Sequence, residues 1–90
     1  MKEVIRYGYD TQQIKSLIFP LLAKSNIDIT DIVLTDYVYS FWVNKTKWSF
    51  SCRDNGIVLC IGDPIMRFDF VCLDDMTKFV SDKILVDSIL

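Results

Sequence analysis

The chain has 90 residues, of which 51% are hydrophobic and 24% charged, and its formal net charge is −2. This length allows a single domain, residues 1–90, and the composition is typical of a folded globular protein rather than a disordered one. So small a charge argues against a DNA mimic, which needs dense acidic stripes to match the spacing of phosphates along a duplex.

The first strong structural signal is a helix in YDTQQIKSLIFPLLAKSN, after residues 2–9, which fit either a short edge strand or a leading coil. Asp10 is a suitable N-cap and Gln13 completes a capping-box pattern, while Asn26 is suited to end the helix. Pro20 predicts a kink or a break into two short helices, because its ring removes a backbone donor. An apolar stripe follows at helical spacing: Ile14, Leu17, Ile18, Leu21 and Leu22.

The middle of the chain predicts strands. Residues 32–43 are rich in β-branched and aromatic side chains and predict one strand, bent or interrupted around Thr35–Asp36. Alternation continues in KWSFSCR at 47–53, and Asn55-Gly56 predicts a type I′ turn into a strand at 57–61. A second turn at 62–64 leads to a strand at 65–72.

The last segment, LDDMTKFVSDKILVDSIL, predicts a helix from about residue 74, with two aspartates favourably placed at its positive end. Its expected inner stripe is Met76, Phe79, Val80, Ile84 and either Leu85 or Val86. The resulting fold class is α+β: an antiparallel β-meander of three to four strands, with an N-terminal and a C-terminal helix packed on one face.

Several chemistries are disfavoured by missing residues. The chain has no histidine, and its three cysteines at 52, 60 and 72 lack the paired spacing of a zinc knuckle. Four aspartates that are near one another in sequence, at 63, 69, 74 and 75, raise the possibility of a Mg²⁺-dependent enzyme. Each has a sufficient structural role in a turn, strand or helix start, so we expect no enzyme, no metal and no cofactor.

The cysteine count also indicates a compartment. Three thiols cannot all pair within one chain, which points to free, buried cysteines in a reducing cytoplasm. The apolar run LIFPLLA at 17–23 is too short to span a membrane. We therefore predict a cytoplasmic protein without a membrane partner.

The stretch KTKWSFSCR is a candidate nucleic-acid-binding strand, because basic and aromatic residues alternate in it. Single-stranded nucleic acid needs aromatics and cations on one surface. Alternation instead sends Trp48 and Phe50 to the face opposite Lys47 and Arg53. Nucleic-acid binding is thus the alternative function, with Trp42 supplying the ring beside a basic sheet face made of Lys45, Lys47, Arg53 and Arg67.

The preferred hypothesis is a small non-enzymatic protein-binding module, acting by occluding a partner protein. Its candidate contact residues are Tyr37, Tyr39, Phe41 and Trp42. One face of their strand must point away from the helices, where it is either an open contact surface or covered by other parts of the fold. An unpaired strand edge would also allow a homodimer. The small size and the absence of catalytic groups suggest an inhibitor, antitoxin, immunity or accessory protein. Seven lysines to three arginines, with eleven isoleucines, indicate an AT-rich source, which fits a phage or a mobile element.

Overall fold

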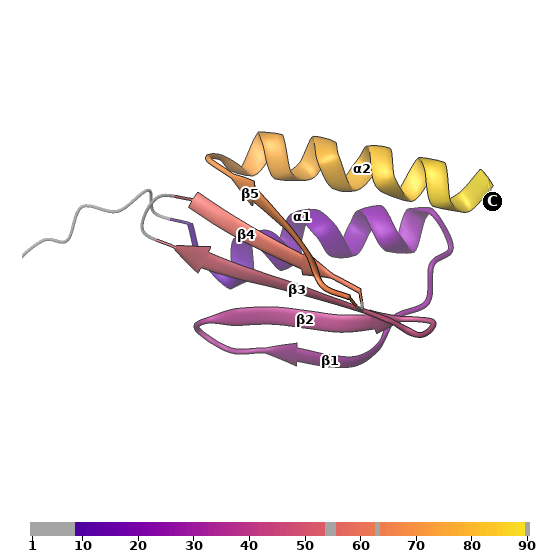
Figure 1. Ribbon diagram of the computed structural model, residues 1–90, viewed down its shortest axis with the longest axis horizontal. Coiled ribbons are helices and arrows are strands. Elements are labelled where there is room, and N and C mark those ends of the chain that lie inside the picture. Colours follow the sequence, from indigo (N-terminus) through magenta and orange to yellow (C-terminus); the bar gives the residue numbers. More distant parts are fainter. Residues whose placement is uncertain (1–8, 54–55, 63, 90) are drawn as a thin grey trace, which may run out of the picture.

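The computed structural model describes residues 9–53, 56–62 and 64–89, which form an α+β domain (Figure 1). Five antiparallel strands follow one another in the sheet in chain order, preceded by one helix and followed by another. The elements are α1 (Thr11–Lys24), β1 (Thr30–Leu34), β2 (Val38–Val43), β3 (Thr46–Arg53), β4 (Gly56–Ile61), β5 (Met66–Phe70) and α2 (Leu73–Ile89). The class and the antiparallel order agree with the prediction, whereas the number of strands does not.

The ends of α1 are set by the residues that the sequence indicated. The Gln13 amide donates to the Asp10 carboxylate at 2.8 Å, and the Asp10 amide donates to the Gln13 side chain at 2.8 Å. At the other end Asn26 has φ 59°, and the amides of Asn26 and Ile27 donate to the carbonyls of Ala23 and Leu22. These paired bonds are those of a Schellman motif, which satisfies carbonyls that the helix itself leaves open.

Of the two outcomes predicted at Pro20, the break into two short helices is wrong, since the helix is continuous from Thr11 to Lys24. A proline in a helix leaves the carbonyl four residues earlier, here that of Ser16, without its amide donor. Both Pro20 and Ser16 lie on the exposed side of the helix, where water can satisfy that carbonyl. The buried stripe of Ile14, Ile18 and Leu22 therefore continues past the proline.

The predicted single strand at 32–43 is two strands, β1 and β2, joined by a tight hairpin. The Thr35 hydroxyl accepts hydrogen bonds from the amides of Tyr37 and Val38, both at 3.1 Å, and the Thr35 amide donates to the Val38 carbonyl at 2.9 Å. Side-chain-to-backbone bonds of this kind stabilise turns. The expected interruption around Thr35–Asp36 is thus a full reversal of the chain, which adds the fifth strand.

The bounds of β3, β4 and β5 lie within two residues of those predicted. Asn44, at φ 56°, occupies the turn between β2 and β3, a left-handed conformation that asparagine tolerates. Across the next hairpin Arg53 pairs with Gly56, but residues 54–55, and with them the predicted Asn55-Gly56 turn, lie outside the described residues. So do residues 1–8, for which either a strand or a coil was predicted.

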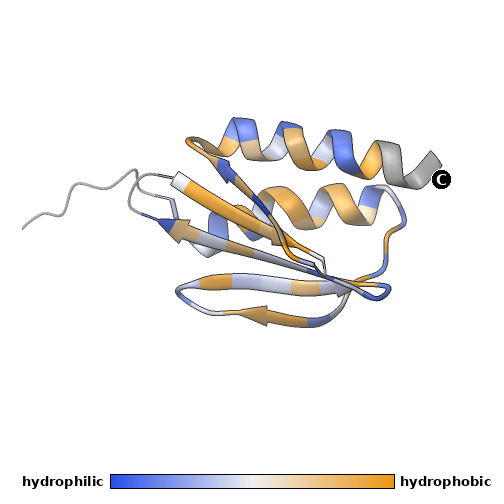
Figure 2. Cartoon of the chain, viewed as in Figure 1, coloured by the Kyte–Doolittle hydropathy of each residue, from blue (hydrophilic) through white to orange (hydrophobic). Residues whose placement is uncertain are grey.

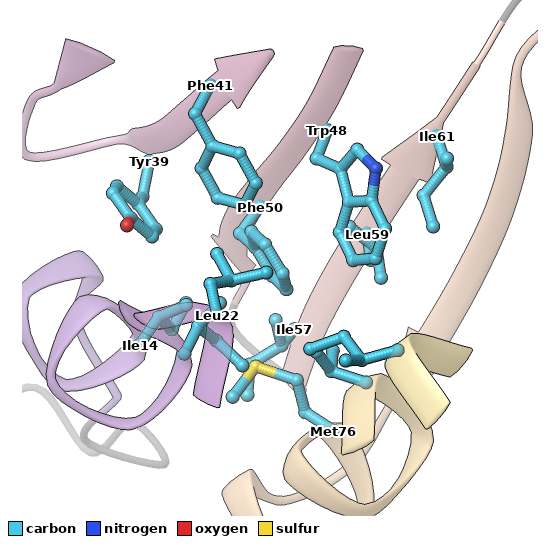
Figure 3. Packing of buried hydrophobic residues seen from close by; sticks show 13 residues of the cluster. Ile14, Leu22, Tyr39, Phe41, Trp48, Phe50, Ile57, Leu59, Ile61 and Met76 are labelled. Atoms are coloured by element: carbon cyan, nitrogen blue, oxygen red, sulfur yellow. The ribbon is translucent and has the colours of Figure 1, made fainter. Parts of the chain in front are cut away.

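The core lies between the sheet and the two helices (Figure 3). Alternate strand residues point into it: Tyr39 and Phe41 from β2, Trp48 and Phe50 from β3, and Ile57, Leu59 and Ile61 from β4. Buried side chains of α1 (Ile14, Ile18, Leu22) and of α2 (Met76, Val80, Ile84) belong to the same cluster. Phe79 of α2 also packs on Phe68 and Phe70, with ring centroids 4.6 and 5.4 Å apart. Both helices therefore cover one face, called the inner face, and within the described ranges the opposite, outer face has no helix on it.

Candidate protein-binding surface

The largest group of exposed apolar side chains surrounds β1, the first edge strand of the sheet. All five residues of β1 are exposed, and Figure 2 shows that the strand is hydrophobic along most of its length. Ile32, Val33 and Leu34 form its apolar part, with Ile32 50% exposed. Three further exposed side chains adjoin it, and together they define what we call the edge surface: Phe19, Ile32, Val33, Leu34, Tyr37 and Trp42.

The sheet register gives the edge surface two sides. Leu34 pairs with Tyr39, a core residue, so its side chain lies on the inner face. Val33 pairs with Ser40, which shares the outer face with Trp42 two residues on. Both sides of β1 are therefore apolar, whereas a solvated edge strand usually places polar residues on one of them.

On the inner side the edge surface continues onto α1. Phe19 and Ile32, from α1 and β1, line a shallow hollow of about 380 Å³ together with Ala23, Asn26, Ile27, Asp28, Ile29 and the largely buried Leu22. Most of this lining is apolar. A flat or bulky apolar side chain of another molecule would find contacts here on both the helix and the strand.

The hairpin that carries Tyr37 is fixed to the rest of the fold. The Thr11 hydroxyl, at the start of α1, donates to the Thr35 carbonyl at 2.6 Å. Thr11 is itself buried, although it is polar. This bond joins the β1–β2 turn to the N-terminal end of α1, so Tyr37, which is 81% exposed, projects from an anchored turn.

The backbone of β1 is irregular. Thr30 pairs with Trp42 and Val33 with Ser40, so β1 contains one more residue than β2 over this interval. Asp31 occupies the bulge with φ 52°. Bulges bend an edge strand and interrupt its row of hydrogen-bonding groups. The edge surface therefore offers side chains rather than a straight backbone edge.

The four residues predicted to bind a partner divide into two pairs. Tyr39 and Phe41 have no exposed surface and pack on each other with ring centroids 5.2 Å apart. Their rings belong to the core, because β2 turns this side to the helices, and they are not available for contact. Tyr37 and Trp42 are exposed, in the turn and on the outer face.

The charges of the edge surface are acidic. From residue 25 to residue 44 the chain contains Asp28, Asp31 and Asp36 but no lysine or arginine. All three carboxylates are exposed, and in the described part of the chain none forms an ion pair. A complementary surface would therefore combine apolar side chains with lysine or arginine.

The basic residues of the alternative hypothesis do lie off the core. Trp48 and Phe50 are buried on the inner face, while Lys47, Arg53 and Arg67 are exposed on the outer face and Lys45 is exposed in the β2–β3 turn. The predicted separation of these two rings from the cations is confirmed. Trp42 is the exception, because it lies on the outer face directly opposite Lys47.

Arg67 is paired within its own strand. Its Nε donates to Asp69 at 2.9 Å and its Nη2 to the same carboxylate at 3.3 Å. The hydrogen bond from Arg67, with the attraction of its charge, lowers the pKa of Asp69, and the same contact raises the pKa of Arg67. Both lie beside Arg53 along a shallow hollow of about 640 Å³, so Asp69 reduces the positive charge of this end of the face.

The acidic and cysteine side chains were also compared with the ligand sets of metal and disulfide sites. Within it, no three Cys, Asp or Glu side chains come together as metal ligands, and Asp63 lies outside it. Cys52, Cys60 and Cys72 are half-buried and form no disulfide, so they are less deeply buried than predicted. Neither α1 nor the described length of α2 is long and apolar enough to cross a bilayer.

Sequence reasoning missed most of the edge surface. The sequence places Ile32, Val33 and Leu34 in a longer strand, and Phe19 beside a predicted kink or break of the helix. The available signal was the run of three apolar residues in DIVLTD, bounded by aspartates on both sides. A short strand that is apolar on both faces and flanked by charge is either central and buried or an exposed contact edge, and only the hairpin distinguishes the two.

Comparisons with protein-family models, with curated proteins and with solved structures found no match to this chain.

Proposed function

We propose that this chain is a small non-enzymatic protein-binding module that occludes a partner protein through the edge surface. The observation that supports the proposal most directly is that Ile32, Val33 and Leu34 of β1 are all exposed beside Tyr37 and Trp42. Contiguous apolar patches on small proteins commonly mark interaction sites. Tyrosine and tryptophan are also enriched among the residues that dominate binding energy.

The rest of the proposal concerns the biological class. The size of the chain and the lack of an apparent catalytic constellation favour an inhibitor, antitoxin, immunity or accessory protein, and its composition favours a phage or mobile-element source. Such proteins act by covering a functional surface of their target. The acidic rim of Asp28, Asp31 and Asp36 favours a target surface that carries lysine or arginine around an apolar centre.

The test uses a partner recovered from lysate with the immobilised chain and then titrated as a purified protein. Ile32→Ser and Trp42→Ala should each weaken binding by about 2 kcal/mol, or roughly 30-fold, as central apolar contacts usually do. Leu17→Ser is the matched control, because Leu17 is an exposed leucine of α1 outside the edge surface. A partner that binds both variants as tightly as the unmodified chain would contradict this function.

The second candidate is binding of single-stranded nucleic acid on the outer face. It is favoured by one observation, the register pairing of Trp42 with Lys47, which places an aromatic and a basic residue side by side on a face that no described helix covers. Fluorescence anisotropy of a labelled oligonucleotide at low salt should then show binding that Lys47→Glu and Arg53→Glu both weaken, because phosphate contacts are strongest at low ionic strength. Absence of binding under those conditions would eliminate it.

A further inference from the structure

The second edge of the sheet, β5, differs from β1 in being regular. Its five residues pair with β4 in unbroken register, from Ile57 opposite Phe70 to Ile61 opposite Met66. β5 is the last strand in the sheet order of the described chain, so its other side is not paired with any described strand. An edge strand with unbroken register is a template for a further strand.

The backbone groups available on this edge follow from the position of Gly56. A side chain at Gly56 would meet the Phe70 carbonyl, so that carbonyl points towards β4. In an antiparallel ladder the amide and carbonyl of one residue point to the same side, and those of the next residue to the other. The backbone groups of Arg67 and Asp69 therefore point away from β4, to the open side.

The side chains of β5 are arranged symmetrically about Phe68. From 65 to 71 the chain is IMRFDFV, in which two apolar residues and a cation precede Phe68, and an anion and two apolar residues follow it. When two identical strands pair antiparallel about Phe68, each residue lies opposite its counterpart at the same distance from the centre. Arg67 then faces Asp69 of the second copy, and the reverse pair forms on the other side of the axis.

We propose that β5 pairs antiparallel with β5 of a second copy of this chain about a two-fold axis at Phe68, joining two domains into one ten-stranded sheet. Each Arg67 then lies between two carboxylates, Asp69 of its own strand and Asp69 of the second copy. Like charges are kept from direct opposition, which is the requirement for a stable cross-strand pair.

The apolar residues at the ends of β5 support the same arrangement. Ile65, Met66 and Val71 are all well over half exposed, although each is a large hydrophobic residue. In the proposed register Ile65 faces Val71 of the second copy, and Met66 faces Phe70. Pairing thus removes apolar surface from water at both ends of the joint.

This dimer goes beyond the proposed function, since it uses the opposite edge of the sheet. β1 and β5 are the two outer strands, separated by β2, β3 and β4. Dimerisation through β5 therefore leaves both edge surfaces open, at the two far ends of the joined sheet. The dimer and the partner contact can accordingly be tested separately, and either can fail without the other.

The main test is the molar mass of the full chain by sedimentation velocity, from micromolar to millimolar concentration. The chain should approach twice its 10.5 kDa mass as the concentration rises. Arg67→Asp places four acids at the joint and Asp69→Arg places four cations there, so each variant alone should remain a monomer. An equimolar mixture of the two variants should form a dimer, because every cross-strand pair is then again one of opposite charge.

Two controls separate the joint from general effects of charge and folding. Lys78→Asp makes the same charge change on the exposed side of α2 and should dimerise as the unmodified chain does. The double variant Arg67→Asp with Asp69→Arg keeps one acid and one base and should also dimerise, even if the single variants fold poorly. Monomers at every concentration, or single variants that dimerise as well as the unmodified chain, would overturn the proposal.

A measurement without any substitution gives an independent result. In the dimer the amides of Arg67 and Asp69 donate across the joint, so their hydrogen exchange should slow towards that of Phe68 and Phe70, which face β4. In a monomer, or in a dimer formed through β1, these two amides face solvent and exchange quickly. Fast exchange at Arg67 and Asp69 in a sample with the mass of a dimer would assign the contact to another surface and refute the β5 pairing.

Discussion

The buried Tyr39 hydroxyl is the group that most clearly lowers the stability of this fold. Tyr39 has no exposed surface, and its hydroxyl has no hydrogen-bond partner among the described residues. Figure 3 shows the Tyr39 side chain in the core, on the side of α1. The ring itself is held by Phe41 and Phe50, with centroids 5.2 and 6.1 Å away. Tyr39→Phe should therefore keep the ring in place and remove only the unpaired hydroxyl.

The expected gain follows from the cost of burying an unpaired polar group, about 1–3 kcal/mol. Dispersion contacts of the lost oxygen reduce this gain by a few tenths of a kcal/mol, since each atom pair contributes about 0.1–0.2 kcal/mol. Tyr39→Phe should thus stabilise the protein by about 1–2.5 kcal/mol. In a domain of this size, 1 kcal/mol corresponds to a shift in Tm of about 4–8 °C.

Urea denaturation measures this difference, with the variant expected to unfold at a higher midpoint and with an unchanged slope. Tyr37→Phe is the matched control, because the Tyr37 side chain is largely exposed and its hydroxyl has little burial cost. It should alter the free energy of unfolding by less than about 0.5 kcal/mol. If Tyr39→Phe destabilises the fold by 1 kcal/mol or more, the hydroxyl has a partner and the reasoning is wrong.

Alkaline pH provides a second check on the same residue. Burial raises the pKa of Tyr39, because a desolvated phenolate is unfavourable. Above the ordinary tyrosine pKa of about 10 the unfolded chain ionises while folded Tyr39 stays neutral, so this residue costs stability as the pH rises towards its folded pKa. The advantage of Tyr39→Phe should accordingly be larger at about pH 11 than at pH 7, and an advantage that shrinks would contradict the raised pKa.

Two further substitutions test the backbone. Gly56→Ala should lower the free energy of unfolding by about 3 kcal/mol or more, because Gly56 has φ 144° and an added methyl would collide with the Phe70 carbonyl. Gly62→Ala, at φ 86° with room for a methyl, should lower it by only about 1–2 kcal/mol. Equal losses for the two variants in urea denaturation would show that movement of β5 relieves the collision. Asp10→Ala should lower the free energy of unfolding by about 0.5–2 kcal/mol by removing the N-cap of α1. Asp28→Ala removes an exposed aspartate that forms no hydrogen bond or ion pair with the described residues, so it should change thermal unfolding little, and a similar loss in both variants would exclude the cap as the explanation.

Local signals in the sequence predicted the helices well. The capping box at Asp10 and Gln13 and the closing role of Asn26 depend on residues within a few positions of one another, so no tertiary information is needed. The alternation that buries Trp48 and Phe50 is likewise local. The break predicted at Pro20 is wrong because the cost of a proline depends on whether the carbonyl that it leaves without a donor meets water. That exposure depends on which side of α1 faces the sheet, and this is tertiary information.

The candidate surface was harder to predict, because it depends on one turn. Treating residues 32–43 as a single strand placed Tyr39 and Phe41 in an aromatic row of undecided exposure. The hairpin at Thr35 makes β1 the edge of the sheet and β2 an inner strand, so the aromatics of β2 are covered and the aliphatics of β1 are not. A threonine hydroxyl that bonds two amides is a weak signal in a β-branched segment, where threonine is also a common strand residue.

The two edges of the sheet are therefore suited to different contacts. On β1, the left-handed conformation of Asp31 interrupts the row of backbone groups, and a second copy pairing there would bring acidic hairpins together. A partner at the β1 edge would therefore be bound by side chains rather than by the backbone, and it would carry positive charge opposite the aspartates. On β5 the backbone is regular and Arg67 and Asp69 complement each other across a two-fold axis. We therefore expect self-association at β5 and contact with a different protein at the apolar, acidic edge surface of β1.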